Sequence, residues 1–194
     1  MKGKNYSCNN VNGKRKANDF YETPYSMTKH LLEQVQFDKS LSVLEPAAGN
    51  GAITKILSQY WSAYNITQYD IEKDFLTETN QFDYIITNPP FSIASEFILK
   101  AKQVATNKIA MLLPLNYLHG KNRFANIWQD KEFPLASVNV FVTYAMLGLP
   151  LRDDGKITSG MITYAWYIWD KEHIGSPVIK WLDNTGDVIT KGDK

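Results

Sequence analysis

Short apolar runs alternate with amphipathic stretches along the first two thirds of the chain. Three runs have the apolar character of strands, at residues 41–44, 84–86 and 109–113, and residues 65–69 are a further strand candidate. Apolar positions recur at helical spacing around them, at residues 24–35, 52–60 and 93–106. Strands that alternate with helices in this way predict a doubly wound α/β sheet, in which the strands run mostly parallel.

The final third of the chain predicts an antiparallel hairpin. Residues 137–149 and 161–169 are two apolar strand patterns, and the Asp154-Gly155 pair between them is typical of tight turns. The aromatic residues of the second strand are most simply interpreted as packing residues: Tyr164, Trp166, Tyr167 and Trp169. Residues 178–182 add a last short strand. We therefore expect the parallel sheet to be closed by an antiparallel C-terminal hairpin.

Residues 1–18 differ in composition from the rest of the chain. They carry Lys2, Lys4, Lys14, Arg15 and Lys16 among Asn, Gly and Ser residues, with almost no apolar periodicity. This pattern predicts a flexible basic N-terminal arm, which either contacts phosphate groups or is a solvated tail. No linker or internal repeat interrupts residues 19–194, which we expect to form a single domain.

Composition and charge exclude several classes of protein. A net charge of +1 over 194 residues gives no overall basic field, so a polyanion would have to be bound by local patches. Cys8 is the only cysteine, which excludes an internal disulfide and a cysteine-based zinc site. No apolar run has the length of a membrane span, and the N-terminus lacks the apolar core of a signal peptide. These features predict a cytoplasmic protein with no membrane or metal partner.

The first apolar run leads directly into a turn of small residues, Glu45-Pro46-Ala47-Ala48-Gly49-Asn50-Gly51, and then into a helix. Glycines in such a turn let the backbone approach a ligand, and the helix N-terminus offers free N–H groups. Thr54 replaces the third glycine of the dinucleotide fingerprint, and no Gly-Lys-Ser/Thr of a phosphate loop follows. Glu45 would repel a pyrophosphate, so the turn favours a ligand with a cationic amine.

Two carboxylates follow the second strand. Asp70 lies about twenty positions after the glycine turn, where an acidic residue can hydrogen-bond the hydroxyls of a ribose. Asp74 precedes Phe75, and this pair could accept a hydrogen bond from an adenine amino group while the ring packs on the base. Taken singly, both acids are more often solvated loop residues. At this offset from the glycine turn, they indicate a nucleoside site.

A stiff turn, Asn88-Pro89-Pro90-Phe91, follows the apolar strand at residues 84–86. Neither proline has an N–H group, and the residue before each proline is restricted to extended geometry. Taken alone, the turn is either a proline stop after a core strand or a rigid polar group at the carboxyl end of a strand. Open α/β folds place their chemistry at this end.

Basic and aromatic residues are interleaved between residues 116 and 128. His119, Lys121 and Arg123 fall close together there, which suits either nucleic-acid binding or a connector helix with a solvated face. Arg152 and Lys156 flank the turn of the predicted hairpin. We take these five side chains as candidate nucleic-acid contacts.

Together and in this order, these stretches resemble the Class I S-adenosylmethionine-dependent methyltransferases. More narrowly, they resemble the small phage-type enzymes that are specific for adenine in DNA. The turn that starts at Glu45 looks like the family's Asp/Glu-Pro-x-x-Gly-x-Gly cofactor loop, and Asn88-Pro89-Pro90-Phe91 matches its Asp/Asn-Pro-Pro-Tyr/Phe catalytic motif. The aromatic strand 164–169 is similar to the family's late strand. The resemblance covers about residues 19–182.

The resemblance implies a seven-stranded Rossmann-like sheet and S-adenosyl-L-methionine as the cofactor. The residues implied to bind this cofactor are Tyr21, Thr23, Pro24, Glu45, Pro46, Ala47, Gly49, Gly51, Asp70, Asp74 and Phe75. The residues implied to be catalytic are Asn88, Pro89, Pro90 and Phe91. Thr23 and Pro24 also suit the N-cap and the first position of the first helix.

The implied reaction is methyl transfer to the exocyclic amino group of adenine in DNA, in a restriction-modification or phage setting. RNA is the first alternative substrate, because the same catalytic motif serves tRNA and rRNA. A protein-glutamine methyltransferase and a cofactor-binding regulatory subunit are further alternatives. Neither the recognition sequence nor the oligomeric state follows from the resemblance.

Two departures from the family pattern stand out. Only three residues separate Asp70 from Asp74, where larger relatives have a helix and a strand. Either that layer is deleted, or Asp74 is not the equivalent acid. The chain also has no room for the target-recognition domain of larger DNA methyltransferases, so we expect loops to read any target sequence.

Overall fold

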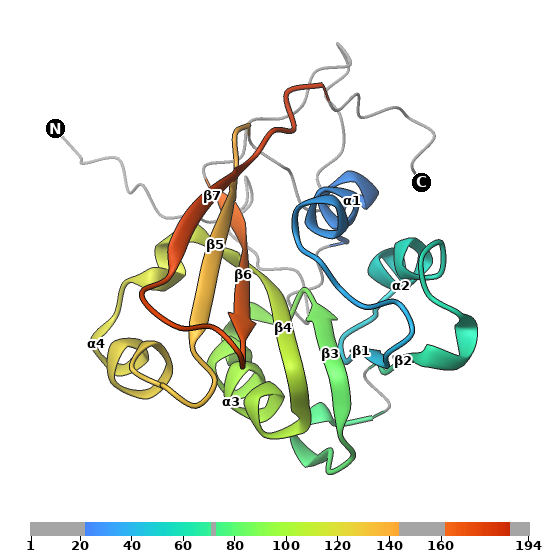
Figure 1. The fold of residues 1–194 in the computed structure, drawn as a ribbon, viewed down its shortest axis with the longest axis horizontal. Coiled ribbons are helices and arrows are strands. Elements are labelled where there is room, and N and C mark those ends of the chain that lie inside the picture. Colours follow the sequence, from blue (N-terminus) through green and yellow to red (C-terminus); the bar gives the residue numbers. More distant parts are fainter. Residues whose placement is uncertain (1–21, 71–72, 144–161, 187–194) are drawn as a thin grey trace, which may run out of the picture.

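The computed structural model describes residues 22–70, 73–143 and 162–186. They form a seven-stranded sheet in the order β2-β1-β3-β4-β6-β5-β7 (Figure 1). The strands are β1 Val43–Glu45, β2 Ile66–Gln68, β3 Phe82–Thr87, β4 Ala105–Pro114, β5 Leu135–Phe141, β6 Tyr164–Asp170 and β7 Val178–Leu182. β6 is antiparallel to β4 and β5, and the other neighbouring pairs are parallel. The predicted mostly parallel sheet with its antiparallel hairpin is confirmed.

Helices cover both faces of this sheet. They are α1 Tyr25–Gln34, α2 Ala52–Leu57, α3 Ala94–Val104 and the short α4 Lys121–Arg123, which continues into a π-helical turn, Phe124–Trp128. α1 and α2 lie on one side of the sheet, and α3 and α4 on the other (Figure 1). The result is the three-layer arrangement expected when strands and helices alternate along a chain.

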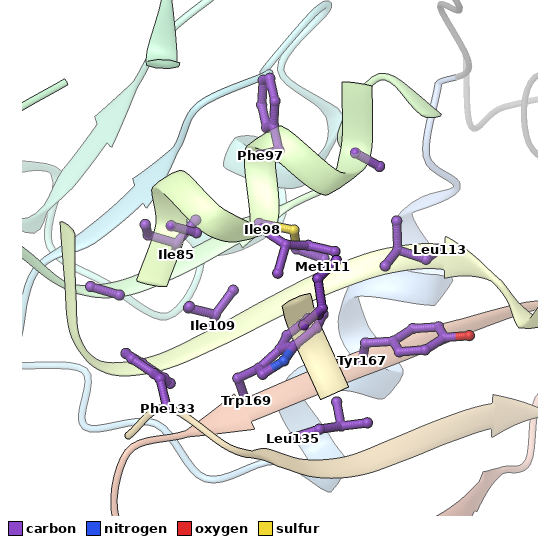
Figure 2. Packing of buried hydrophobic residues seen from close by; sticks show 14 of the residues in the cluster. Ile85, Phe97, Ile98, Ile109, Met111, Leu113, Phe133, Leu135, Tyr167 and Trp169 are labelled. Atoms are coloured by element: carbon purple, nitrogen blue, oxygen red, sulfur yellow. The ribbon is translucent and has the colours of Figure 1, made fainter. Parts of the chain in front are cut away.

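β4 shows why the strands appear as continuous apolar runs in the sequence. Ile109, Met111 and Leu113 point toward α3, as Figure 2 shows, whereas Ala110 and Leu112 belong to the cluster under α1 and α2. All five side chains are fully buried. A strand covered by helices on both faces has no solvent side, so it shows no alternation of polar and apolar positions.

The aromatic strand β6 is packed in the core, as predicted. Trp166, Tyr167 and Trp169 are fully buried. The indole N–H of Trp166 donates to the backbone carbonyl of Met27 at 2.9 Å, which ties β6 to α1. On the other face, the Trp128 ring stacks on Trp169 with ring centroids 6.0 Å apart and an interplanar angle of 10°.

The prediction for the start of the first helix was wrong. α1 begins at Tyr25 with Pro24 at the N-cap position, and no side chain caps it. The hydroxyl of Thr23 instead accepts a hydrogen bond from the side-chain amide of Asn88, at 3.0 Å. The Thr23 hydroxyl thus contacts the proline turn and not the end of the helix.

The sheet ends at β2 on the side of the glycine turn. No described residue forms a strand beyond β2, and a short 3₁₀ helix, Phe75–Thr77, is the regular element described between β2 and β3. The short spacing between Asp70 and Asp74 thus coincides with the absence of an α-helix and a strand at this edge among the described residues. The segment that follows β2 consequently lies at an open edge of the sheet.

Candidate active site

A cavity of about 340 Å³ lies where β1, β2 and β3 end, at the carboxyl edge of the sheet. Its lining is Glu22, Thr23, Glu45, Pro46, Ala47, Ala48, Gly49, Asn50, Ala52, Ile53, Asp70, Lys73, Asp74, Phe75, Asn88, Pro90, Ile93 and Phe97. Most of the predicted site residues are therefore brought together. Four others do not line the cavity but adjoin lining residues in the sequence: Pro24, Gly51, Pro89 and Phe91. Tyr21 lies outside the described residues.

The glycine turn is shaped by backbone geometry. Gly49 and Gly51 have φ values of 52° and 76°, in the left-handed region that glycine adopts without steric cost. The Tyr69 N–H donates to the Glu45 carbonyl and the Ala48 N–H donates to the Tyr69 carbonyl, each at 2.8 Å. The turn after β1 is thereby tied to the segment after β2.

Glu45 places a buried carboxyl group in the cavity wall. The residue is 1% exposed, and its Oε2 accepts a hydrogen bond from the Thr54 hydroxyl at 2.6 Å. Burial raises the pKa of Glu45 to about 7, although the Thr54 hydrogen bond acts in the opposite direction. Near neutral pH this carboxyl group can therefore lose its proton and pair with a cation.

Acidic side chains dominate the charge of the cavity. Glu22, Glu45, Asp70 and Asp74 line it, and Lys73 is the one basic side chain among the described lining residues. Lys73 is itself paired with a carboxylate outside the lining, with its Nζ 2.7 Å from Oε2 of Glu78. Such a lining disfavours phosphate groups and suits a positively charged ligand.

The Asp74-Phe75 pair is fixed in the wall that faces α3. Oδ1 of Asp74 accepts a hydrogen bond from the Leu76 N–H at 2.9 Å and so caps the 3₁₀ helix. The Phe75 ring is 2% exposed and packs on Phe97, with ring centroids 5.0 Å apart. The ring therefore forms a rigid part of the cavity wall.

Asn88 follows β3 directly and lines the same cavity. Its Nδ2 donates to the Thr23 hydroxyl at 3.0 Å, and the two residues are 65 positions apart in the sequence. With the amide nitrogen bonded to Thr23, the orientation of the side-chain oxygen is set as well. Pro89, directly after Asn88, is buried, which holds the backbone of the turn in place.

No protein-family model matches the sequence. Over 82 residues the chain is 30% identical to the Type II methyltransferase M.HincII of Haemophilus influenzae. This stretch covers 36% of the present chain and 16% of that protein, so the chain spans only a small part of the relative's length.

Several solved structures share the fold. The M protein of the Type I restriction enzyme EcoKI has a TM-score of 0.58 at 13% identity, over 91% of this chain and 51% of that one. The 23S rRNA methyltransferase ErmE has a TM-score of 0.52 at 14% identity, over 81% and 71%. Magnesium protoporphyrin IX methyltransferase of Synechocystis PCC 6803, solved with bound S-adenosylmethionine, has a TM-score of 0.50 at 15% identity, over 76% and 77%. The chain has the methyltransferase fold. The resemblance inferred from the motifs is confirmed at this level.

In this methyltransferase fold, the segment after β4 lies beside the start of α3. The Tyr117 hydroxyl is 2.7 Å from the Ser95 hydroxyl, shortly after the proline turn. Arg123 donates from Nε to the Tyr117 carbonyl at 2.8 Å and from Nη2 to the His119 carbonyl, and its guanidinium lies 4.4 Å from the centre of the Tyr117 ring. Arg123 therefore shapes the loop, whereas His119 and Lys121 are exposed.

The remaining candidate contacts, Arg152 and Lys156, lie outside the described residues, as do residues 1–18. Among the described residues, no group of three or more His, Cys, Asp or Glu side chains is placed to hold a metal ion. None of the helices in this part of the chain combines the length and apolar character needed to cross a bilayer.

Two residues beside the cavity were not assigned to the site from the sequence. Tyr164, at the start of β6, stacks on the Phe91 ring with centroids 5.8 Å apart and an interplanar angle of 28°. Glu78 is 4% exposed and holds Lys73. From the sequence, Tyr164 was only part of the aromatic strand 164–169, because its contact with Phe91 joins distant parts of the chain, and no motif marks Glu78.

Proposed function

We propose that the chain transfers a methyl group from S-adenosylmethionine to the exocyclic amino group of adenine in DNA. The observation that supports this most directly is the position of Asn88, a rigid amide at the end of β3, in the wall of an acidic cavity. The similarity to M.HincII and to the EcoKI M protein supports DNA as the substrate.

The residues of the cavity fit S-adenosylmethionine. When bound, this cofactor supplies an electrophilic methyl group on a positively charged sulfonium. The Glu45 carboxylate would bind the amine of its methionine part, Asp70 the ribose, and Asp74 with Phe75 the adenine. The excess of acidic groups in the lining supports a cationic ligand of this kind.

The proline turn would act on the amine of the target base. This amine is a poor nucleophile because its lone pair is delocalised into the ring. The side-chain oxygen of Asn88 and the backbone carbonyl of Pro89 are acceptors that would localise the lone pair on the nitrogen. Asn88 cannot ionise, so its contribution is preorganised polarity rather than proton abstraction. Thr23 would keep the amide oxygen, rather than the amide nitrogen, turned toward the substrate.

Phe91 would stack on the target base, and Tyr164 supports this ring from behind by its own stacking contact. A base within a duplex cannot enter such a site, so the target adenine must be flipped out or already single-stranded. His119 and Lys121 are exposed on the neighbouring segment and would contact the phosphate backbone.

RNA is the second candidate substrate, because the 23S rRNA methyltransferase ErmE shares the fold. The deciding experiment offers DNA, RNA and protein separately with methyl-labelled S-adenosylmethionine and then identifies the labelled nucleoside or amino acid. We expect label on the 6-amino group of deoxyadenosine. Label on adenosine or glutamine would identify the alternative substrate, and no label in any sample would contradict the proposed function.

The affinity for S-adenosylhomocysteine, the product form of the cofactor, is expected to rise with pH. The ionised fraction of a group with a pKa of about 7 grows from about a tenth to about nine tenths between pH 6 and pH 8. If the ionised Glu45 binds the ligand amine, the affinity should therefore rise roughly tenfold over this interval. Calorimetric titration at several pH values measures this directly.

Glu45→Gln is the control for this pH dependence. The amide cannot ionise, so this variant should bind more weakly and show no rise attributable to position 45. Titration of the ligand itself is common to both proteins and cancels in the comparison. The same rise in both proteins would show that Glu45 is not the group that binds the amine.

A further inference from the structure

Glu78 is a buried carboxylate that has no part in the proposed chemistry. It is 4% exposed, although glutamate is almost never fully buried unless it is paired. It does not line the cavity. Its position is in the segment between β2 and β3, directly after the 3₁₀ helix Phe75–Thr77.

The carboxylate of Glu78 is fully used in contacts within this segment. Oε2 accepts from the Lys73 ammonium at 2.7 Å, and Oε1 accepts from the backbone N–H groups of Thr79 at 2.9 Å and Asn80 at 2.8 Å. The Lys73 ammonium and then the Tyr69 hydroxyl are the main causes that hold the pKa of Glu78 down to about 2. Glu78 therefore stays ionised across the physiological pH range.

Lys73 connects this carboxylate to the cavity. The backbone N–H of Lys73 donates to the Asp70 carbonyl at 2.9 Å, and Lys73 lines the cavity. Its Nζ lies 3.7 Å from the centre of the Tyr69 ring. The backbone of Tyr69 is in turn bonded to the glycine turn through Glu45 and Ala48. A continuous set of contacts thus runs from Glu78 to the first loop of the site.

This set of contacts lies where the sheet gives no support. β2 is the last strand on this side in the described part of the chain, so the segment after it has no strand ladder to fix its backbone. Fixing the backbone of a residue costs about 1–2 kcal/mol of conformational entropy, which other interactions must offset. Asp74 also has only a single turn of 3₁₀ helix after it.

We propose that Glu78 is a positioning residue, which acts through Lys73 to hold Asp70 and Asp74 in the geometry that binds the cofactor. The pair holds this segment where no described strand supports it. This inference rests on the proposed function, since it concerns binding of the cofactor at the same cavity. It predicts an effect on cofactor affinity and not on the chemical step.

Glu78→Ala is expected to weaken S-adenosylhomocysteine binding about tenfold while turnover at saturating S-adenosylmethionine stays near that of the unmodified protein. A tenfold loss corresponds to the binding geometry being populated about a tenth of the time. Lys73→Met should cause a similar loss, whereas Lys73→Arg keeps the cation and should retain most of the affinity. Calorimetry with S-adenosylhomocysteine and saturation kinetics measure the two quantities separately.

Asp130 offers a matched control outside the cavity. Its Oδ2 lies 2.8 Å from the Lys102 ammonium, and its Oδ1 accepts from the backbone N–H groups of Glu132 and Phe133. Asp130 and Lys102 thus form an ion pair whose carboxylate also accepts from two backbone N–H groups, as that of Glu78 does. Neither residue lines the cavity. Asp130→Ala should lower the melting temperature without changing cofactor affinity.

The outcomes separate this inference from the function on which it rests. If the unmodified chain does not bind S-adenosylhomocysteine, the proposed function is contradicted. If the unmodified chain binds but Glu78→Ala binds equally well, or loses only thermal stability as Asp130→Ala does, the positioning role is contradicted alone. If Glu78→Ala does not fold, Lys73→Met and Lys73→Arg decide by the same criterion, because they change the other end of the pair.

Discussion

Replacing Asn88 with alanine is expected to lower methyl transfer at least about 100-fold while S-adenosylhomocysteine binding stays nearly unchanged. Removal of one preorganised polar group costs about this much in other enzymes. The amide lies in the cavity wall at the end of β3, where the reacting amine of the substrate would have to approach the cofactor. Single-turnover assays with the labelled cofactor measure the loss in the chemical step.

A related prediction concerns Thr23, the hydrogen-bond partner of Asn88. The Thr23 hydroxyl accepts from Nδ2 of Asn88, so Thr23→Val should remove this hydrogen bond, orient the amide less well and lower turnover by a smaller factor. Thr23→Ser keeps the hydroxyl and should restore most of the activity. An Asn88→Ala variant with near-normal turnover would contradict the mechanism. Loss of S-adenosylhomocysteine binding in that variant would show that Asn88 supports the cavity instead of acting on the substrate.

The sequence was informative about the fold because the buried strands have a simple signature. Strands covered by helices on both faces, such as β4, appear as uninterrupted apolar runs, and the alternation with helices then limits the topology. Boundaries were less accurate. α2 ends at Leu57 instead of residue 60. β4 starts four residues before the apolar run, because Ala105 and Lys108 also pair with β3.

Only the site residues that belong to local motifs could be predicted from the sequence. Gly49 adopts a left-handed backbone conformation that favours glycine, and the prolines after Asn88 restrict its backbone. The residue types at these positions therefore indicated the site. The pairing of Thr23 with Asn88 and the stacking of Tyr164 on Phe91 join residues that are far apart in the chain. Such pairs leave no periodicity or spacing in a single sequence, so only the folded arrangement reveals them.

Replacing Gly49 with valine is expected to reduce cofactor affinity more than the same change at Gly51. Gly49 lines the cavity and has a φ of 52°, a conformation that costs an ordinary residue about 1–2 kcal/mol and a β-branched residue more. The added side chain would also occupy space at the cavity wall. Because the strain and the added side chain both act at the cavity wall, we expect S-adenosylhomocysteine binding to fall at least about tenfold by calorimetric titration, which is about 1.4 kcal/mol.

Backbone strain and blockage of the cavity can be separated with two other glycines. Gly51 has a φ of 76° but does not line the cavity, so Gly51→Val should weaken binding less than Gly49→Val. Gly175 has a φ of 108° in the loop between β6 and β7, with open space where a Cβ would lie. Gly175→Val should therefore lower the melting temperature and leave affinity unchanged. If Gly49→Val loses only stability, as expected for Gly175→Val, the glycine turn does not cradle the cofactor, and the ligand must bind elsewhere on the carboxyl edge of the sheet.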